Sequence, residues 1–382
     1  MLIRTVKNDF TVLFSISPFV PCHVIGLPSM RAFFKPTATK IALFVLGSIV
    51  LGALLSPIVY HVGQNMVEAG TLKGGWLQGI HDSMERATFA RYFNRSLTLA
   101  AVLLLWPTIR WIRSDQPEKD DRGFLLLEKN PRRWIHLLIG FFVACGTLLL
   151  LGYIYTKTGV YDPRDPEKAL SRILINALTS AIAVAFLEEY IFRGALMALI
   201  LRTAKPKVAL VFLTAFFAFI HFLQPPKTKA FETVLKTMEI DWTSGFWIMG
   251  QIFGQFGNPA FFLAEFTVLF AVGLILGYSR LKTKSLWLGI GLHAGWVFGI
   301  KFFSPFTRLT KDAKEMIKAI KGEGKEDLFF TFWQQIPWYG DSLRSGLNSA
   351  LVVTFSGILI WMWLKYREAK NRDPFEDYRN DG

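Results

Sequence analysis

The apolar residues of this 382-residue chain gather in blocks of about 20, which is the length of helix that crosses the ~30 Å hydrocarbon layer of a bilayer. Only 19% of the residues are charged, fewer than a soluble protein of this length usually carries. Because a helix satisfies its own backbone hydrogen bonds in lipid, we predict an all-α, polytopic transmembrane helical bundle with about eight spanning helices. These are expected at residues 41–62, 93–112, 134–155, 172–201, 206–223, 259–279, 284–304 and 348–365.

The order of the blocks divides the chain into three predicted regions. Residues 1–169 form an N-terminal membrane region with about three spanning helices, and residues 170–304 form a four-helix core. Residues 305–382 contain a long loop, the last spanning helix and a tail. Within that loop, residues 310–321 have an amphipathic pattern and residues 328–339 are rich in aromatic side chains. The pair is expected either at the membrane interface or in an ordinary solvated loop.

The first part of the sequence leaves the translation start open. Residues 10–28 are apolar but are broken by three prolines, and they lack a signal-peptide cleavage pattern. Met30 is followed by basic residues and then by the first good apolar block, so the chain starts at either Met1 or Met30.

The net charge of +14 points to lipid rather than to nucleic acid. Lys and Arg flank the apolar blocks, where they bind lipid headgroups, and no basic run with interleaved aromatic residues is present. Residues 110–133, 202–207, 280–284 and the tail after Trp363 are the basic segments expected on one side. The positive-inside rule therefore predicts a multi-pass protein of the cell membrane with both termini cytoplasmic, although the 305–347 loop also carries many lysines.

Ionisable residues enter the 172–201 block, where each costs several kcal/mol unless it is paired or hydrated. Glu189 and Arg193 are four residues apart, so they share a helix face and are expected to pair. Glu188 points about 100° away from that face. The cluster is either a buried ion pair that fixes helix register, or a site in which the arginine orients one acid while the other handles protons.

Two of the six histidines occupy neighbouring apolar blocks. His221 follows Phe217 by four residues, and His293 lies among glycines that permit close helix approach. A histidine at a span end is often only a hydrogen-bonded interfacial residue, but two beside a Glu pair predict that all converge. Glu265 and Lys301 are possible further members of the site; the alternatives are a headgroup-level residue for Glu265 and a snorkelling one for Lys301.

Glu188, His221 and His293 are suited to holding a water molecule. A buried carboxylate is a good general base, one imidazole orients the water, and the other donates to the developing oxyanion. No Gly-x-Ser-x-Gly motif or catalytic cysteine context is present. Two histidines and a glutamate also form a known zinc ligand set, but there is no His-Glu-x-x-His motif, and Cys22 and Cys145 suggest no metal knuckle or disulfide framework. We therefore expect no cofactor, with zinc as the alternative.

These motifs resemble a known family. Glu188-Glu189-x-x-x-Arg193, then Phe217-x-x-x-His221, then His293 in a glycine-rich span are similar to the CPBP family of intramembrane glutamate endopeptidases, the CAAX-protease and bacteriocin-processing proteins. The similarity covers about residues 170–304. It implies that Glu188, His221 and His293 are catalytic, and that Glu189, Arg193 and Phe217 support them. The family usually has Asn or Asp four residues after the last histidine, where this chain has Val297.

Three functions follow as alternatives. The first is an intramembrane endopeptidase that cleaves a membrane-associated protein or peptide. The second is a catalytically impaired immunity or binding protein, which the valine at position 297 would favour. The third is a transporter that uses the buried charges as a proton path, although no pair of interrupted helices in matching halves is present. Nothing in the sequence specifies the substrate or the oligomeric state.

Overall fold

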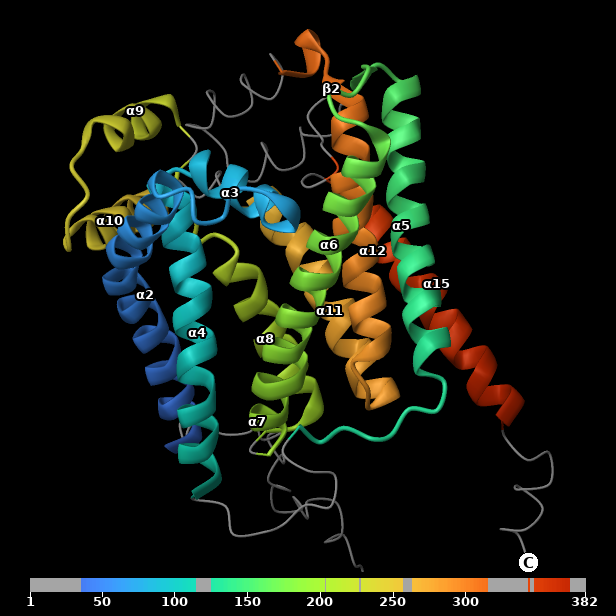
Figure 1. Cartoon of the computed structure of the whole chain (residues 1–382). Helices are drawn as coiled ribbons and strands as arrows, with labels where there is room; N and C mark the ends of the chain where they lie inside the picture. Colours follow the sequence, from blue (N-terminus) through green and yellow to red (C-terminus); the bar gives the residue numbers. More distant parts are fainter. Residues whose placement is uncertain are drawn as a thin grey trace, which may run out of the picture.

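The computed structural model describes residues 36–114, 125–202, 204–226, 228–256, 263–314, 343 and 347–371, and these are mostly helical, with almost no sheet (Figure 1). Each of the eight predicted segments contains a helix. The helices are α2 (Pro36–Glu68), α4 (Phe89–Ser114), α5 (Arg133–Lys157), α6 (Leu170–Glu189) with α7 (Met197–Leu201), α8 (Pro206–Ile220), α11 (Leu263–Thr283), α12 (Trp287–Phe303) and α15 (Leu347–Asn371). The predicted all-α class is therefore confirmed.

Judged by length and apolarity, fewer helices could span a membrane than the sequence predicted. Among the described residues, five helices are long and apolar enough to cross a membrane, and α8, at 15 residues, is a shorter apolar helix. The count of eight spans is thus not confirmed. The five are Thr39–Glu68, Arg133–Lys157, Leu170–Leu201, Phe266–Thr283 and Asn348–Arg367.

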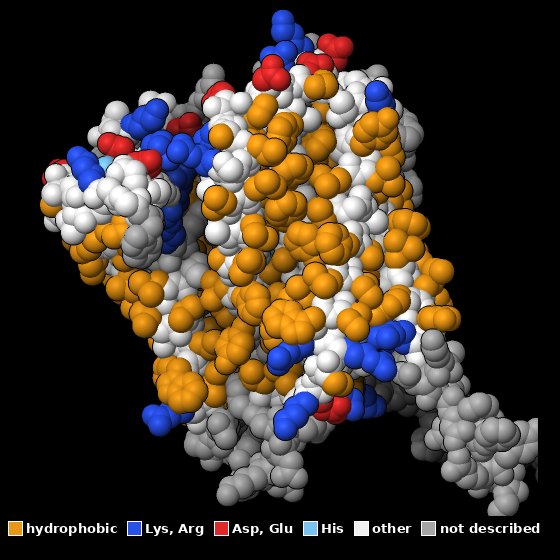
Figure 2. Space-filling view, turned by 45° about the vertical axis from the view of Figure 1, so that its right-hand side comes forward, with side chains coloured by type: hydrophobic (Ala, Val, Ile, Leu, Met, Phe, Trp, Pro, Cys, Tyr) orange, Lys and Arg blue, Asp and Glu red, His pale blue; other side chains and the backbone are white. Residues whose placement is uncertain are grey.

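The surface carries a broad apolar belt with charged side chains above and below it (Figure 2). Many large apolar side chains of the helices are strongly exposed, among them Phe142, Ile175 and Leu46. An exposed apolar area of this extent is unfavourable in water and favourable against lipid chains. The protein is therefore embedded in a membrane.

Short elements occupy the connections at one end of the bundle (Figure 1). They are α3 (Gln78–Glu85), α9 (Lys229–Thr237), α10 (Ser244–Gln255), two 3₁₀ turns at Gly75–Leu77 and Ser304–Phe306, and the antiparallel strands β1 (Tyr161–Pro163) and β2 (Thr307–Leu309). Thr243 and Ser244 donate hydrogen bonds to the Asp241 carboxylate. These bonds close the turn before α10 and lower the pKa of the carboxyl. These elements were not predicted from the sequence pattern.

The basic connections lie at the opposite end. The 125–132 connection, the α7–α8 turn, the α11–α12 turn and the end of α15 are on the same side of the bundle (Figure 1). This agrees with the predicted grouping of the basic segments, while their cytoplasmic location remains a prediction. Residues 10–28, 328–339 and most of 310–321 lie outside the described residues.

Helix α12 packs against α5 and α6 and also contacts α11. Its glycines allow this approach: a Cβ atom on Gly291 would overlap the carbonyl oxygen of Leu137, and one on Gly295 would overlap that of Phe141. Small residues at such contacts let backbones come together where no water can fill a gap. The close packing fixes the position of His293 between these two glycines.

Candidate functional site

Glu189 and Arg193 form a buried ion pair at the end of α6. The Glu189 and Arg193 side chains are each 1% exposed, and Arg193 Nη1 donates to Glu189 Oε1 at 3.0 Å. Arg193 Nη2 also donates to the backbone oxygen of Gly273 on α11 at 3.3 Å, and its guanidinium lies 4.2 Å from the centroid of the Phe217 ring. The guanidinium is thus enclosed by three helices, so its desolvation is offset by hydrogen bonds and a cation–π contact.

The backbone changes its winding directly after Glu189. Residues Tyr190–Leu196 are π-helical, and all of them after Tyr190 are buried. Single π turns within α-helices are uncommon and occur frequently at functional sites. The sequence pattern did not predict this π-helical turn. The pairing of Glu189 with Arg193 is equally expected in an ordinary α-helix, so it does not reveal the change of winding.

His293 is bound to the same carboxylate from the facing helix. Its Nδ1 atom lies 3.0 Å from Glu189 Oε1. One turn earlier on α12, a Cβ atom on Gly289 would come within 2.8 Å of Glu189 Oε2. Because Gly289 has no side chain, there is space for the Glu189 carboxylate to lie against the His293 imidazole.

We expect Gly289→Ala to weaken the site without unfolding the bundle. The added methyl group would displace a carboxylate that Arg193 and His293 both hold, so activity should fall by about tenfold or more, since small misplacements of catalytic groups are costly. Gly146→Ala on α5 is the matched control, because nothing lies within 4 Å of its added Cβ atom. Equal cleavage rates for the two purified variants would contradict this prediction.

Glu188 lies between the two histidines. Its Oε2 atom is 3.8 Å from His221 Nε2 and 3.7 Å from His293 Nε2. These distances are too long for direct hydrogen bonds, but a water beside the atoms would be within bonding distance of each. Glu188 Oε2 and Glu189 Oε2 are buried, and neither accepts a hydrogen bond from a described residue. Buried carboxylate oxygens are normally satisfied, so the arrangement favours a water at this point.

The backbone and Glu189 set the tautomers of the two imidazoles. His221 Nδ1 lies 2.8 Å from the carbonyl oxygen of Phe217, and His293 Nδ1 faces the carboxylate of Glu189. Both partners are acceptors, so each Nδ1 atom carries a proton. The Nε2 atoms that face Glu188 are then lone-pair acceptors in the neutral rings. The three side chains are thus arranged to share a proton.

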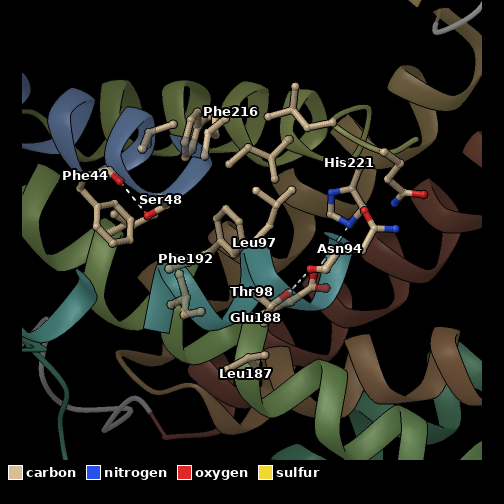
Figure 3. A pocket seen from close by; sticks show the side chains of 18 residues that line it. Phe44, Ser48, Asn94, Leu97, Thr98, Leu187, Glu188, Phe192, Phe216 and His221 are labelled. Carbon is tan, nitrogen blue, oxygen red and sulfur yellow. Dashed lines mark hydrogen bonds and ion pairs between the residues drawn. The ribbon is translucent and has the colours of Figure 1, made fainter. Parts of the chain in front are cut away.

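A cavity of about 340 Å³ opens beside Glu188 and His221 (Figure 3). Residues of α2, α4, α6, the π-helical turn and α8 line it, and most of them are apolar. The polar residues that join Glu188 and His221 in the lining are Ser48, Asn94, Thr98 and Gln224. His293 is not among the described lining residues, so it approaches Glu188 from behind the cavity wall.

The remaining predicted site residues lie apart from this cluster or beneath it. Phe217 is buried, and its ring centroid is 4.5 Å from that of His221, so it packs under the imidazole. Lys301 is exposed on α12 and does not line the cavity. Glu265 lies in the first turn of α11, but its side chain lies outside the described residues. Val297 packs in the apolar cluster around Ala181 and Ala185 of α6.

Two contributions to this region were missed from the sequence. Arg280, counted there as a surface charge of a basic turn, is buried and donates to the backbone oxygens of Arg193, Leu125 and Leu126. It therefore joins the π-helical turn to the connection before α5. Asn94 lines the cavity from α4, and a lone amide at the beginning of an apolar block carries no recognisable signal.

A group able to hold a metal ion lies elsewhere in the described part of the chain. His81, Asp82 and Glu85 of α3 have ligand atoms within 4.8 Å of one another. The predicted zinc alternative would instead use Glu188 and the two histidines near it. The absence of a cofactor at the cavity remains a prediction.

The same helices are those that a comparison with known families identifies. Residues 170–299 match the family model described as "Rce1-like: Type II CAAX prenyl endopeptidase Rce1-like". That family model is part of the CPBP family. The Rce1-like region contains Glu188, Glu189, Arg193, His221 and His293, and it indicates an intramembrane protease of the CAAX type. Comparisons with curated proteins and with solved structures gave no match.

Proposed function

We propose that the protein hydrolyses a peptide bond of a membrane-associated protein or peptide with a water molecule activated by Glu188 and His221. The observation that supports this most is the buried Glu188 Oε2 atom. It has no hydrogen-bond partner among the described residues, lies between two imidazole nitrogens and belongs to a residue that lines the cavity. A base in contact with both a water and a substrate cavity is what direct hydrolysis requires.

The reaction proceeds by addition and elimination. Glu188 accepts a proton from the water while His221 Nε2 orients it, and the water oxygen bonds to the carbonyl carbon. The resulting tetrahedral intermediate carries its negative charge on the former carbonyl oxygen. Glu188 then transfers its proton to the amide nitrogen, the carbon–nitrogen bond breaks, and an amine and a carboxylic acid are formed, between which a proton passes to give an ammonium and a carboxylate. No covalent enzyme intermediate is formed.

Glu189 and Arg193 act in this proposal through His293. The ion pair holds Glu189 Oε1 at His293 Nδ1, which directs His293 Nε2 toward Glu188. His293 therefore lies beside Glu188 as a partner for proton exchange, and the predicted oxyanion contact would require a proton on its Nε2 atom.

The substrate reaches the site from the membrane. The cavity is largely apolar, and the outer surfaces of its helices face lipid, so the bound segment is an extended chain with apolar groups on either side of the scissile bond. The description of the matched family names a CAAX prenyl endopeptidase, so prenylated CAAX proteins are one class of substrate for the proposed activity. The proposal also places the protein in the cell membrane with both chain ends cytoplasmic.

Mapping of new protein N-termini in membranes tests this function. Membranes containing the wild-type protein should yield N-termini that are missing from membranes containing Glu188→Gln. Because water is activated by side chains alone, the cleavage should survive treatment with a strong zinc chelator. Loss of cleavage in chelator, with recovery on adding Zn²⁺, would instead establish the zinc-dependent alternative.

One observation favours a second function, that of a catalytically impaired binding or immunity protein. Val297, one turn after His293, packs against apolar residues and offers no donor. If the wild-type protein is inactive on every membrane substrate while Val297→Asn cleaves, this second function is the correct one.

A further inference from the structure

Helix α12 supplies too few donors for the charge that hydrolysis creates. The oxyanion of a tetrahedral intermediate is usually held by two preorganised donors. The Nδ1 atom of His293 donates its proton to Glu189, and its Nε2 atom faces Glu188. His293 also does not line the cavity. Val297 is apolar. If peptide hydrolysis takes place here, a donor must reach the carbonyl oxygen from another wall of the cavity.

Among the polar side chains of the cavity wall, only one is well suited to supply this hydrogen-bond donor. Ser48 Oγ donates to the backbone oxygen of Phe44 at 2.7 Å, and Thr98 Oγ1 donates to that of Asn94 at 3.2 Å, so both hydroxyl protons are engaged. Gln224 is exposed. The Asn94 side chain is half-buried and has no hydrogen-bond partner among the described residues. A half-buried amide without a partner is available to a ligand.

Asn94 also lies at the reactive end of the cavity. Figure 3 shows Asn94 beside His221 and Glu188, while Phe44 and Ser48 lie at the far end. A peptide carbonyl group bound over Glu188 and His221 at this end of the cavity would therefore have the Asn94 amide as a neighbour. The NH₂ group of this amide is the donor type that the developing negative charge requires.

We propose that the side-chain NH₂ group of Asn94 donates a hydrogen bond to the oxyanion of the tetrahedral intermediate. This inference rests on the proposed hydrolase function and adds a catalytic residue to it. Helix α4 lies outside the matched residues 170–299. The N-terminal membrane region thereby completes an active site that the Rce1-like region contains only in part.

The proposal predicts a loss in turnover rather than in substrate binding. Removing one oxyanion donor typically reduces kcat by about 10²–10³-fold, and a contact strengthened only in the transition state leaves KM almost unchanged. Asn94→Leu has nearly the same shape but no donor, and Asn94→Asp keeps polarity and size in case the leucine variant does not fold. Asn176→Leu is the control, since Asn176 is exposed on α6 outside the cavity.

The assay uses a quenched fluorescent peptide built on a cleavage site mapped by N-terminal proteomics. We expect kcat to fall about 100-fold in both Asn94 variants, with KM within about threefold of wild type. The inhibition constant of the matching peptide aldehyde should rise by a similar factor, about 100-fold. Asn176→Leu should match the wild type. A kcat within about threefold of wild type, or a loss in KM alone, overturns the assignment.

Glu188→Gln measured in parallel separates the two proposals. If that variant is inactive while the Asn94 variants turn over normally, only the role of Asn94 is rejected. If Glu188→Gln itself turns over normally, the hydrolase mechanism falls, and the Asn94 inference falls with it.

Discussion

Replacing Glu188 by Gln is expected to lower the rate of peptide cleavage by about 10²–10⁴-fold, the usual contribution of a general base. The amide has nearly the same shape as the carboxylate but cannot accept a proton from water. The Glu188 carboxylate lies too far from His221 and His293 for direct hydrogen bonds, so the substitution breaks none of them and the bundle should fold and insert as before. The measurement is kcat for the fluorescent peptide with purified protein in lipid nanodiscs, together with the thermal unfolding midpoint.

The control for this experiment is Glu232→Gln, which makes the same chemical change on an exposed residue of α9. It should retain full turnover. Wild-type kcat in the Glu188 variant would remove the central step of the mechanism, whereas a large fall in its unfolding midpoint would assign Glu188 a structural role instead.

Arg193→Met is expected to destabilise the folded bundle by about 3–5 kcal/mol and to abolish cleavage, because it leaves Glu189 as an uncompensated buried charge. The arginine is 1% exposed and bonds to both Glu189 and the backbone of Gly273. Its loss should also release His293 from its fixed orientation. Arg308→Met is the control, since the Arg308 guanidinium is exposed and lies 3.7 Å from Asp162 at the surface.

A double variant distinguishes stability from function in this pair. Glu189→Leu combined with Arg193→Met removes both charges and fills the space with apolar groups, which is often neutral for stability. We expect the unfolding midpoint to recover most of what Arg193→Met loses, while cleavage stays absent because His293 Nδ1 has no acceptor. Recovery of cleavage in the double variant would show that the ion pair only maintains the fold.

Much of this architecture was predictable because it depends on local rules. The length of each apolar block predicts a helix, since backbone groups in lipid must bond within their own segment. The spacing of Glu189 and Arg193 predicts their pairing, because residues four apart share a helix face. The rarity of ionisable side chains in apolar blocks singled out Glu188, His221 and His293 before any contact between them was known.

Other features depended on how the helices pack against one another. His293 is 104 residues from Glu189 in the chain, and only the close approach of α12 brings its Nδ1 atom to that carboxylate. The π-helical turn and the buried position of Arg280 were likewise not predictable from the spacing of residues.

The sequence by itself determined the membrane class, the positions of the helices and the residue types available for proton transfer, because helix length, periodicity and the cost of burying charge act within one segment. The tertiary structure decided which nitrogen of each histidine faces Glu188, that His293 lies behind the cavity wall, and that Asn94 of α4 lies beside the site. These facts follow from packing between helices, where glycine contacts such as Gly291 on Leu137 fix distances that no single segment encodes.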